Sequence, residues 1–351
     1  MERIIAHLDM DCFFCQCEEK QNPALKNNPV IVGSTGERGV VSAANYEARK
    51  YGVFSATPIS VARKLCPEGF FLPVNKTLYK QESDKIMSAL GSVCDGFEQV
   101  SVDEAYLDIT SIYLSYGNLE KVGLFLQKVV KDNSQMSCSV GISNSRYVSK
   151  IASDYRKPGG ITVVEDVSRF LFSLDIGKIP GIGKVSKKKF NSLDVWTIGE
   201  LAEMDKFKLM DSFGVYGVQL QNIAKGLDRT GLNKNERIKS YSRENTFSSD
   251  VSDFSFLKDS LRDLCERVHV DLGNYFFRTV SLKIRYQDFV TITRDVSLKT
   301  SSRDIDIILD KSFELFEKNY TRGRPVRLIG VKLSNITGGT DRQLTLDSFG
   351  F

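Results

Sequence analysis

The run QVSVDEAYLDIT, residues 99–110, places two adjacent acids in the middle of a sequence that otherwise favours a β-strand. Successive side chains of a strand point to opposite faces, so one continuous strand would send either Asp103 or Glu104 into a core at high cost. A reversal between two strands removes this conflict, because consecutive side chains at a turn need not point to opposite faces. The sequence therefore predicts a tight β-hairpin, with strands over 98–102 and 105–109 and both acids at or beside its tip.

The N-terminal segment RIIAHLDMD, residues 3–11, alternates between apolar and polar residues toward its end. Leu8 and Met10 fall on one face, and the other face carries His7, Asp9 and Asp11. This alternation predicts a half-buried strand with carboxylates at its C-terminal end. Asp9 would then meet the two hairpin acids at one edge of a sheet.

Three carboxylates at one sheet edge repel each other unless a cation neutralises them. Mg²⁺ prefers hard oxygen ligands of this kind and shares its coordination shell with water and phosphates. Two such ions about 3.5–4 Å apart stabilise the attacking and leaving oxygens of an in-line displacement at phosphorus. This chemistry requires mainly positioning and charge neutralisation, in agreement with a chain that has only two histidines. The alternative is that Asp9 and Asp103 are exposed acids at strand ends.

A second group of candidate residues is cationic. The run NYEARK places Tyr46 and Arg49 three residues apart, on one face of a short helix, and RKPGG places Lys157 just before a turn. A guanidinium, a phenol hydroxyl and an ammonium group together suit a triphosphate. The alternative for Tyr46 and Arg49 is an ordinary solvated helix face.

The segment PGIGKVSKKKF contains a glycine turn followed by lysines. Gly181 and Gly183 allow backbone N–H groups to face outward at a helix start, where a phosphate can bind. Lys184 and Lys187 follow, so the pattern predicts a helix-hairpin-helix that contacts a DNA backbone without reading sequence. The alternative is a plain turn with solvated lysines.

Two aromatic residues, Phe13 and Phe14, follow Asp9 in the expected strand-to-helix turn. The alternative for Phe14 is that it is an ordinary core residue. If a metal site lies beside it, the ring would clash with a 2′-hydroxyl and select deoxyribose.

Length and composition limit the class of protein. The 351 residues suffice for two or three domains, and 41% hydrophobic with 26% charged residues argue against disorder. The seven cysteines are odd in number, which disfavours a disulfide framework. With no signal peptide and no apolar run of about 18 residues, the sequence predicts a soluble intracellular protein. The net charge of +4 permits a polyanionic partner without requiring one.

The chain divides into stretches of different character. Residues 1–165 mix strands and helices, 167–230 predict short helices only, and 231–240 are polar without periodicity. From Tyr241 onward the expected order is strand, helix, strand, strand, helix, strand, a βαββαβ unit with one sheet and two helices. The predicted fold class is therefore α+β.

Taken together, six motifs resemble those of the Y-family DNA polymerases: HLDMDCFF, VSAANYEARKYGV, SVDEAYLDIT, VGISNS, KIASDYRKPGG and IPGIGKVSKKKF. The chain is similar to the polymerase IV/DinB branch, including the short archaeal lesion-bypass enzymes, over essentially its full length. The resemblance implies a right-hand architecture. Its implied parts are a palm (1–11 and 78–165), small fingers (12–77), a helical thumb (166–230), a linker (231–240), a little finger (241–340) and a C-terminal tail (341–351).

The resemblance also implies roles for single residues. The implied ligands of two Mg²⁺ ions are Asp9, Asp103, Glu104 and the backbone carbonyl of Met10. The implied nucleotide contacts are Tyr46, Arg49, Lys157, Phe13 and Phe14, with Phe14 as the steric gate. The chain departs from the family pattern at Ala43, where threonine is usual, and at Ser145 and Arg146, where asparagine and lysine are usual.

The C-terminal tail QLTLDSFGF resembles a peptide that binds a sliding clamp. Gln343, Leu346 and Phe349 fit a Q-x-x-L-x-x-F pattern, with Phe351 as a second aromatic residue. Leu346 and Phe349 would share one face of a single helical turn and so suit a groove. The alternative is an inert tail.

The predicted function is template-dependent DNA synthesis of the translesion type, from dNTP onto a primer 3′-OH. The sequence shows no second acidic cluster for a proofreading exonuclease, so we expect low fidelity and low processivity. The expected enzyme is a monomer in a prokaryotic cytoplasm, with primer-template DNA and a clamp as partners. Two alternatives are a non-catalytic DNA-binding scaffold with a polymerase fold and a two-metal nuclease or nucleotidyl cyclase.

Overall fold

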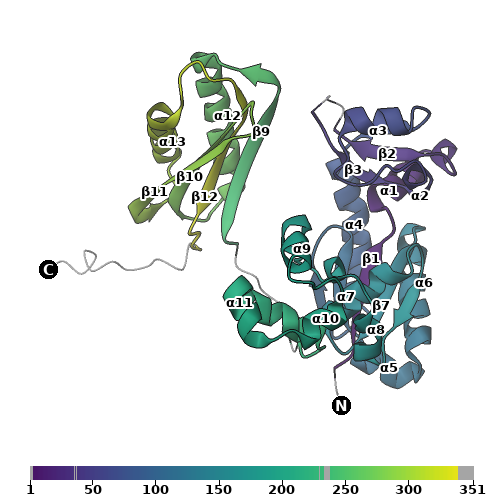
Figure 1. The fold of residues 1–351 in the computed structure, drawn as a ribbon. Coiled ribbons are helices and arrows are strands. Elements are labelled where there is room, and N and C mark those ends of the chain that lie inside the picture. Colours follow the sequence, from purple (N-terminus) through teal and green to yellow (C-terminus); the bar gives the residue numbers. More distant parts are fainter. Residues whose placement is uncertain (1–2, 35, 37, 229, 233–237, 339–351) are drawn as a thin grey trace. The chain divides into compact units, whose positions relative to one another are not determined.

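The computed structural model describes residues 3–338 except 35, 37, 229 and 233–237 (Figure 1). The chain forms two compact units, one of Met1–Thr35 with Gly39–Lys234 and the other of Gly36–Arg38 with Asn235–Phe351. No helix of the described residues is long and apolar enough to cross a membrane. All seven cysteines lie among the described residues and are free.

A five-stranded sheet organises the first unit. Its order is β5-β6-β1-β7-β8, with antiparallel pairs except for β7 and β8. The strands are β1 (Ile5–Met10), β5 (Gly96–Gln99), β6 (Glu104–Asp108), β7 (Cys138–Ser143) and β8 (Ile161–Val163). The predicted hairpin is confirmed in β5 and β6, although β5 ends three residues earlier than expected and β6 begins one residue earlier. Asp103 lies in their connection and Glu104 opens β6.

The central strand β1 is buried along its whole length, so the expectation of a half-buried strand was wrong. Its apolar face, with Ala6, Leu8 and Met10, packs into a core with α4 (Lys76–Gly91) and α6 (Leu119–Ser134). Its polar face is covered as well, by α7 (Arg146–Tyr155). The alternation was correct, but it could not reveal that a helix covers the polar side.

Close packing of α7 depends on a glycine in β7. A Cβ added at Gly141 would lie 2.1 Å from Ser149 O and 2.3 Å from Ser153 N. Real side-chain atoms do not approach backbone so closely, since interiors are already packed to crystal density. The missing side chain at Gly141 therefore allows α7 to lie directly on the sheet.

A smaller sheet of the first unit has the order β3-β2-β4, with β2 parallel to β4. The strands are β2 (Val30–Gly33), β3 (Val41–Ala44) and β4 (Phe70–Pro73). The neighbouring helices are α1 (Phe13–Gln21), the 3-10 turn η1 (Pro23–Leu25), α2 (Tyr46–Arg49) and α3 (Ile59–Leu65). Asn45 caps α2, since its side chain accepts from the Ala48 backbone N–H.

The predicted helical stretch over 167–230 is confirmed. It comprises α8 (Val167–Phe172), η2 (Ile176–Lys178), α9 (Lys184–Asn191), α10 (Ile198–Glu203) and α11 (Lys206–Ala224). These short elements share one hydrophobic core, which includes Phe190, Leu201 and Leu220. The remaining helix of the unit is α5 (Thr110–Tyr116).

The second unit has the predicted βαββαβ order. Its elements are β9 (Ser240–Val251), α12 (Phe254–Leu272), β10 (Phe277–Tyr286), β11 (Thr291–Ser302), α13 (Ile305–Asn319) and β12 (Val326–Ser334). The sheet order is β11-β10-β12-β9, with every pair antiparallel. Both helices share its core. The tail residues Gln343, Leu346, Phe349 and Phe351 lie outside the described residues.

Candidate active site

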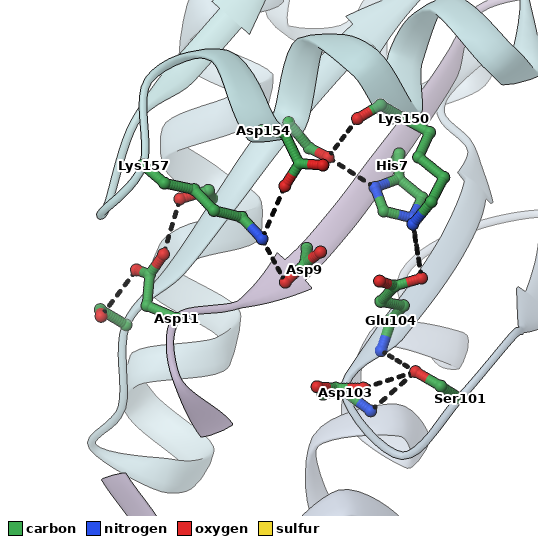
Figure 2. Close-up of polar contacts among 12 residues, drawn as sticks. His7, Asp9, Asp11, Ser101, Asp103, Glu104, Lys150, Asp154 and Lys157 are labelled. Atoms are coloured by element: carbon green, nitrogen blue, oxygen red, sulfur yellow. Dashed lines mark hydrogen bonds and ion pairs between the residues drawn. The ribbon is translucent and has the colours of Figure 1, made fainter. Parts of the chain in front are cut away.

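The predicted acidic residues meet at one end of the central strand. Asp9 of β1 lies directly opposite Glu104 of β6 in the antiparallel register. The Met10 backbone N–H donates to Asp103 O at 3.0 Å, which holds the hairpin connection against the end of β1. The three acids therefore share one corner of the sheet (Figure 2), although Asp9 lies about a hundred positions before Asp103 and Glu104 in the sequence. Met10 lies at the same corner through its bond to Asp103.

Ser101 organises the hairpin connection. Its hydroxyl lies 2.5 Å from Asp103 Oδ1 and accepts from the backbone N–H groups of Asp103 and Glu104 at 3.3 and 3.0 Å. Serine side chains commonly bond to nearby backbone in turns, so the S-x-D-E spacing carried a signal for this role.

Lys157 lies on the acidic corner. Its Nζ is 2.7 Å from Asp9 Oδ1 and 2.9 Å from Asp154 Oδ1. Burial disfavours the charge on Lys157, but Asp9 and Asp154 together raise its pKa above the ordinary value. Burial raises the pKa of Asp9, whose residue is 6% exposed, and the Lys157 ammonium opposes that rise.

Glu104 has two partners that the sequence did not indicate as site residues. Lys150 Nζ lies 2.7 Å from Glu104 Oε2. His7 Nε2 is 3.7 Å from the same oxygen, too long for a hydrogen bond, while His7 Nδ1 lies 2.7 Å from Ser153 Oγ. His7 and Lys150 hold the pKa of Glu104 below its ordinary value, and burial lowers the pKa of His7.

A spacing signal for these partners was present in the sequence. Lys150, Asp154 and Lys157 are separated by four and three residues, which places them on one face of a helix and its extension. His7 shares the polar face of its strand with Asp9. What the sequence could not show is that these two polar faces lie against each other.

The donor set of this corner suits a hard divalent cation, since it consists of carboxylates and a backbone carbonyl. Among the described residues, however, no three His, Cys, Asp or Glu side chains are arranged to hold a metal ion. Asp9 and Glu104 each have a lysine ammonium at 2.7 Å instead. Residues and chemistry therefore fit a metal, and its binding requires these ion pairs to rearrange.

Tyr46 and Arg49 share one face of α2, as predicted. The Arg49 guanidinium lies 4.5 Å from the centroid of the Tyr46 ring, and Arg49 Nε donates to Ala44 O at 3.0 Å. The Tyr46 hydroxyl lies 3.5 Å from Asp11 Oδ1. Burial raises the pKa of Tyr46 to about 12, so the phenol is a hydrogen-bond donor at neutral pH.

The two aromatic candidates at the start of α1 differ in exposure. Phe13 is buried in the core of the sheet. Phe14 is half-buried and stacks on Tyr79, with ring centroids 4.2 Å apart and planes 12° apart. Only Phe14 therefore presents part of its ring outside the core.

The glycine turn before α9 has the expected backbone. Gly181 adopts φ +95°, a conformation that favours glycine, and Gly183 caps α9 without a side-chain hydrogen bond. Lys184 is exposed. Lys187 Nζ, by contrast, lies 2.7 Å from Asp175 Oδ2, so this lysine reaches a phosphate only by leaving its ion pair.

Arg146, which stands where lysine is usual in the family pattern, has several partners in the structure. Its guanidinium donates to both carboxylate oxygens of Glu98 and lies 4.2 Å from the Tyr106 ring centroid. It also donates to Gly231 O at 3.4 Å. The first two residues of the predicted linker therefore lie on the large sheet, since Leu232 packs against Gly96 of β5.

Comparison with known proteins assigns the family. Residues 8–154 match the impB/mucB/samB family, 164–195 the IMS family HHH motif and 238–346 the impB/mucB/samB family C-terminal domain. The DNA polymerase IV of Methanoculleus marisnigri is 40% identical over 355 residues, covering 99% of this chain and 98% of that protein. The DNA polymerase IV of Staphylococcus aureus strain JH9 is 37% identical over 353 residues, covering 99% of both. The chain belongs to the impB/mucB/samB family of Y-family DNA polymerases.

Solved structures agree with this assignment. The polymerase superposes on a Y-family DNA polymerase chimera, Dbh-Dpo4(243-245)-Dbh, with a TM-score of 0.84, 29% identity and coverage of 95% of this chain and 99% of that one. An insertion ternary complex of Dbh DNA polymerase gives a TM-score of 0.67 at 29% identity and the same coverage. The fold class and the function predicted from sequence, a translesion DNA polymerase, are confirmed.

Proposed function

We propose that the polymerase joins a dNTP to a primer 3′-OH at the corner formed by Asp9, Asp103 and Glu104. The observation that supports this most directly is the cross-strand pair of Asp9 and Glu104, with Asp103 bonded to the backbone of Met10. Neighbouring carboxylates repel each other, and nearby cations favour their charged forms. Dependence on a divalent metal follows from the family.

We assign two Mg²⁺ ions to Asp9, Asp103, Glu104 and the Met10 carbonyl. When bound, such ions neutralise charge on the attacking and leaving oxygens. In the structure, the ammonium groups of Lys150 and Lys157 offset part of the negative charge of the corner. In this proposal, the Lys157 ammonium leaves Asp9 and forms an ion pair with the triphosphate, while Tyr46 and Arg49 contact the same phosphates.

Phe14 is proposed as the gate against ribonucleotides. Its ring is anchored on Tyr79, which leaves it little freedom to move away from a 2′-hydroxyl. Gly181, Gly183 and Lys184 are proposed to bind the DNA backbone through the N–H groups of the first turn of α9, with Lys187 assisting after release from Asp175.

These roles assign the parts of the right-hand polymerase architecture. The five-stranded sheet is the proposed palm, the small sheet lies in the fingers, the helical stretch is the thumb and the βαββαβ unit is the little finger. We further propose a monomeric enzyme of the prokaryotic cytoplasm with low fidelity and no proofreading. Its clamp-binding tail would use Gln343, Leu346, Phe349 and Phe351.

Primer extension tests the proposal. Wild type, Glu104→Ala and the control Glu120→Ala, an exposed acid on α6, are compared on undamaged and abasic templates with Mg²⁺ and dNTPs. Extension that only Glu104→Ala abolishes supports the metal site, and bypass of the abasic site supports low selectivity. Increased use of rNTPs by Phe14→Ala supports the gate. Activity retained by Glu104→Ala would exclude this site, and a wild type that binds DNA without extending it would favour the scaffold alternative.

A further inference from the structure

Asp11 is a buried carboxylate beside the catalytic corner with surroundings of its own. It follows β1 directly and is 1% exposed. Its Oδ1 accepts from Ser139 Oγ at 2.8 Å and lies 3.5 Å from the Tyr46 hydroxyl. Its Oδ2 accepts from Ser137 Oγ at 2.8 Å and from the Gly159 backbone N–H at 2.9 Å.

These donors distinguish Asp11 from its neighbour Asp9. All four are neutral groups, and no lysine or arginine of the described residues forms an ion pair with Asp11. Figure 2 shows the Asp11 carboxylate among its own partners, apart from the Asp9–Lys157–Asp154 group. A carboxylate that already accepts from three protein donors at 2.8–2.9 Å is a poor metal ligand. Asp11 is therefore a structural anchor of the site.

Two of the donors belong to segments that carry proposed triphosphate contacts. Tyr46 is itself one of these contacts. Gly159 closes the turn that begins with Lys157, two residues earlier. Asp11 thus joins α2 and the Lys157 turn to the end of β1, where the metal-binding corner begins.

We propose that Asp11 is a positioning residue that fixes the Lys157 turn, and to a lesser degree Tyr46, for the incoming triphosphate. The inference rests on the proposed phosphate roles of Lys157 and Tyr46. The bond to Gly159 has ordinary length, whereas 3.5 Å is long for a hydroxyl donor. The turn is therefore held firmly, and Tyr46 keeps freedom to adjust.

Asparagine is a weaker substitute for this carboxylate. Its NH₂ group takes the place of one oxygen, so the hydroxyls on that side must accept instead of donate. Its neutral oxygen is also a weaker acceptor for the Gly159 N–H than the carboxylate is, so we expect the turn to be held less firmly in Asp11→Asn.

Steady-state insertion of one nucleotide tests the proposal on the full-length enzyme. We expect Asp11→Asn to raise KM for dNTP about tenfold or more, with Kd for primer-template DNA within about twofold of wild type. The matched control is Glu82→Gln, which changes a buried acid on α4 that pairs with Lys20 and Lys85. This control is expected to lower Tm while leaving KM for dNTP unchanged.

A double-mutant cycle locates the effect. If Asp11 acts through Lys157, Asp11→Asn adds little to the KM of Lys157→Ala, because the group it positions is absent. Full additivity of the two effects would overturn the proposal. The same holds for a KM within about twofold of wild type, or for a parallel loss of kcat and DNA affinity.

Two further outcomes separate this inference from the function on which it rests. An unchanged KM in Lys157→Ala would refute the phosphate role of Lys157, and the role of Asp11 falls with it. A raised KM in Lys157→Ala with a normal KM in Asp11→Asn would overturn only the positioning role. Should Asp11→Asn fail to fold, Ser137→Ala and Ser139→Ala each remove one fixed donor. Both are then expected to raise KM for dNTP by smaller factors, and an unchanged KM in both would overturn the proposal.

Discussion

Two central strands of this polymerase, β1 in the first unit and β10 in the second, have alternating sequences but different surroundings. In β10 the apolar residues Val280, Leu282 and Ile284 enter the core, while Lys283 and Arg285 remain partly exposed. In β1 the polar face is buried, because α7 covers it. A charged side chain therefore remains an ordinary surface group on β10, whereas Asp9 of β1 interacts with Asp154 of α7 and with Lys157 just after it. The buried polar face of β1 therefore carries the residues of the proposed active site.

The largest effect is expected at Asp9. Asp9→Asn removes the buried charge of β1 while conserving its shape, so primer extension should fall by about three orders of magnitude or more. Single-turnover extension with saturating dNTP measures this loss, and unchanged binding of primer-template DNA is the control. Retention of a tenth of the activity would mean that the buried face of β1 is not the centre of catalysis.

In β10 the largest expected effect is on stability. Ile284→Ala removes a fully buried side chain and should destabilise the second unit by about 2–5 kcal/mol. Urea unfolding followed by circular dichroism measures the free energy, and insertion kinetics with a short primer-template serve as comparison. A loss below about 1 kcal/mol would show that the core of the second unit tolerates a cavity, contrary to its dense packing.

An intermediate effect is expected where α7 meets Glu104. Lys150→Met keeps the length of the side chain but removes the ammonium that, at the proposed metal site, would compete with Mg²⁺ for Glu104. We expect kcat to fall about tenfold and the half-maximal Mg²⁺ concentration to fall severalfold, since attraction between opposite charges is strong in partly buried sites. A Mg²⁺ titration of extension rates decides this. A higher Mg²⁺ requirement would contradict the competition.

The smallest effect is expected at Lys283, the counterpart of Lys150 on β10. Its Nζ lies 2.8 Å from Glu244 Oε1, much as Lys150 contacts Glu104, but both partners are about a third exposed. Lys283→Ala should change the free energy of unfolding by less than about 1 kcal/mol. The same urea experiment tests this, and a larger loss would remove the contrast between the two strands.

Sequence patterns predicted much of this molecule because its signals are local. The hairpin followed from two adjacent acids, the βαββαβ unit from six short patterns and the turn before α9 from Gly181 and Gly183. The packing of α7 on the polar face of β1 could not be predicted. The alternation of a strand shows which residues share a face, but it does not show which element packs on that face. Lys150 and His7 were missed as partners of Glu104 for the same reason, since these contacts join residues 46 and 97 positions apart.

The contact between α7 and the sheet has a consequence for how this enzyme can change over generations. Lys150 and Lys157 reach the acids only because nothing stands on Gly141. Position 141 therefore has no room for a larger residue, although it carries no charge. In a saturation library scored for DNA synthesis, only glycine should survive there, while many replacements are tolerated at exposed positions such as Glu120. A glycine in the sheet thus determines how far Lys150 and Lys157 extend toward the acids.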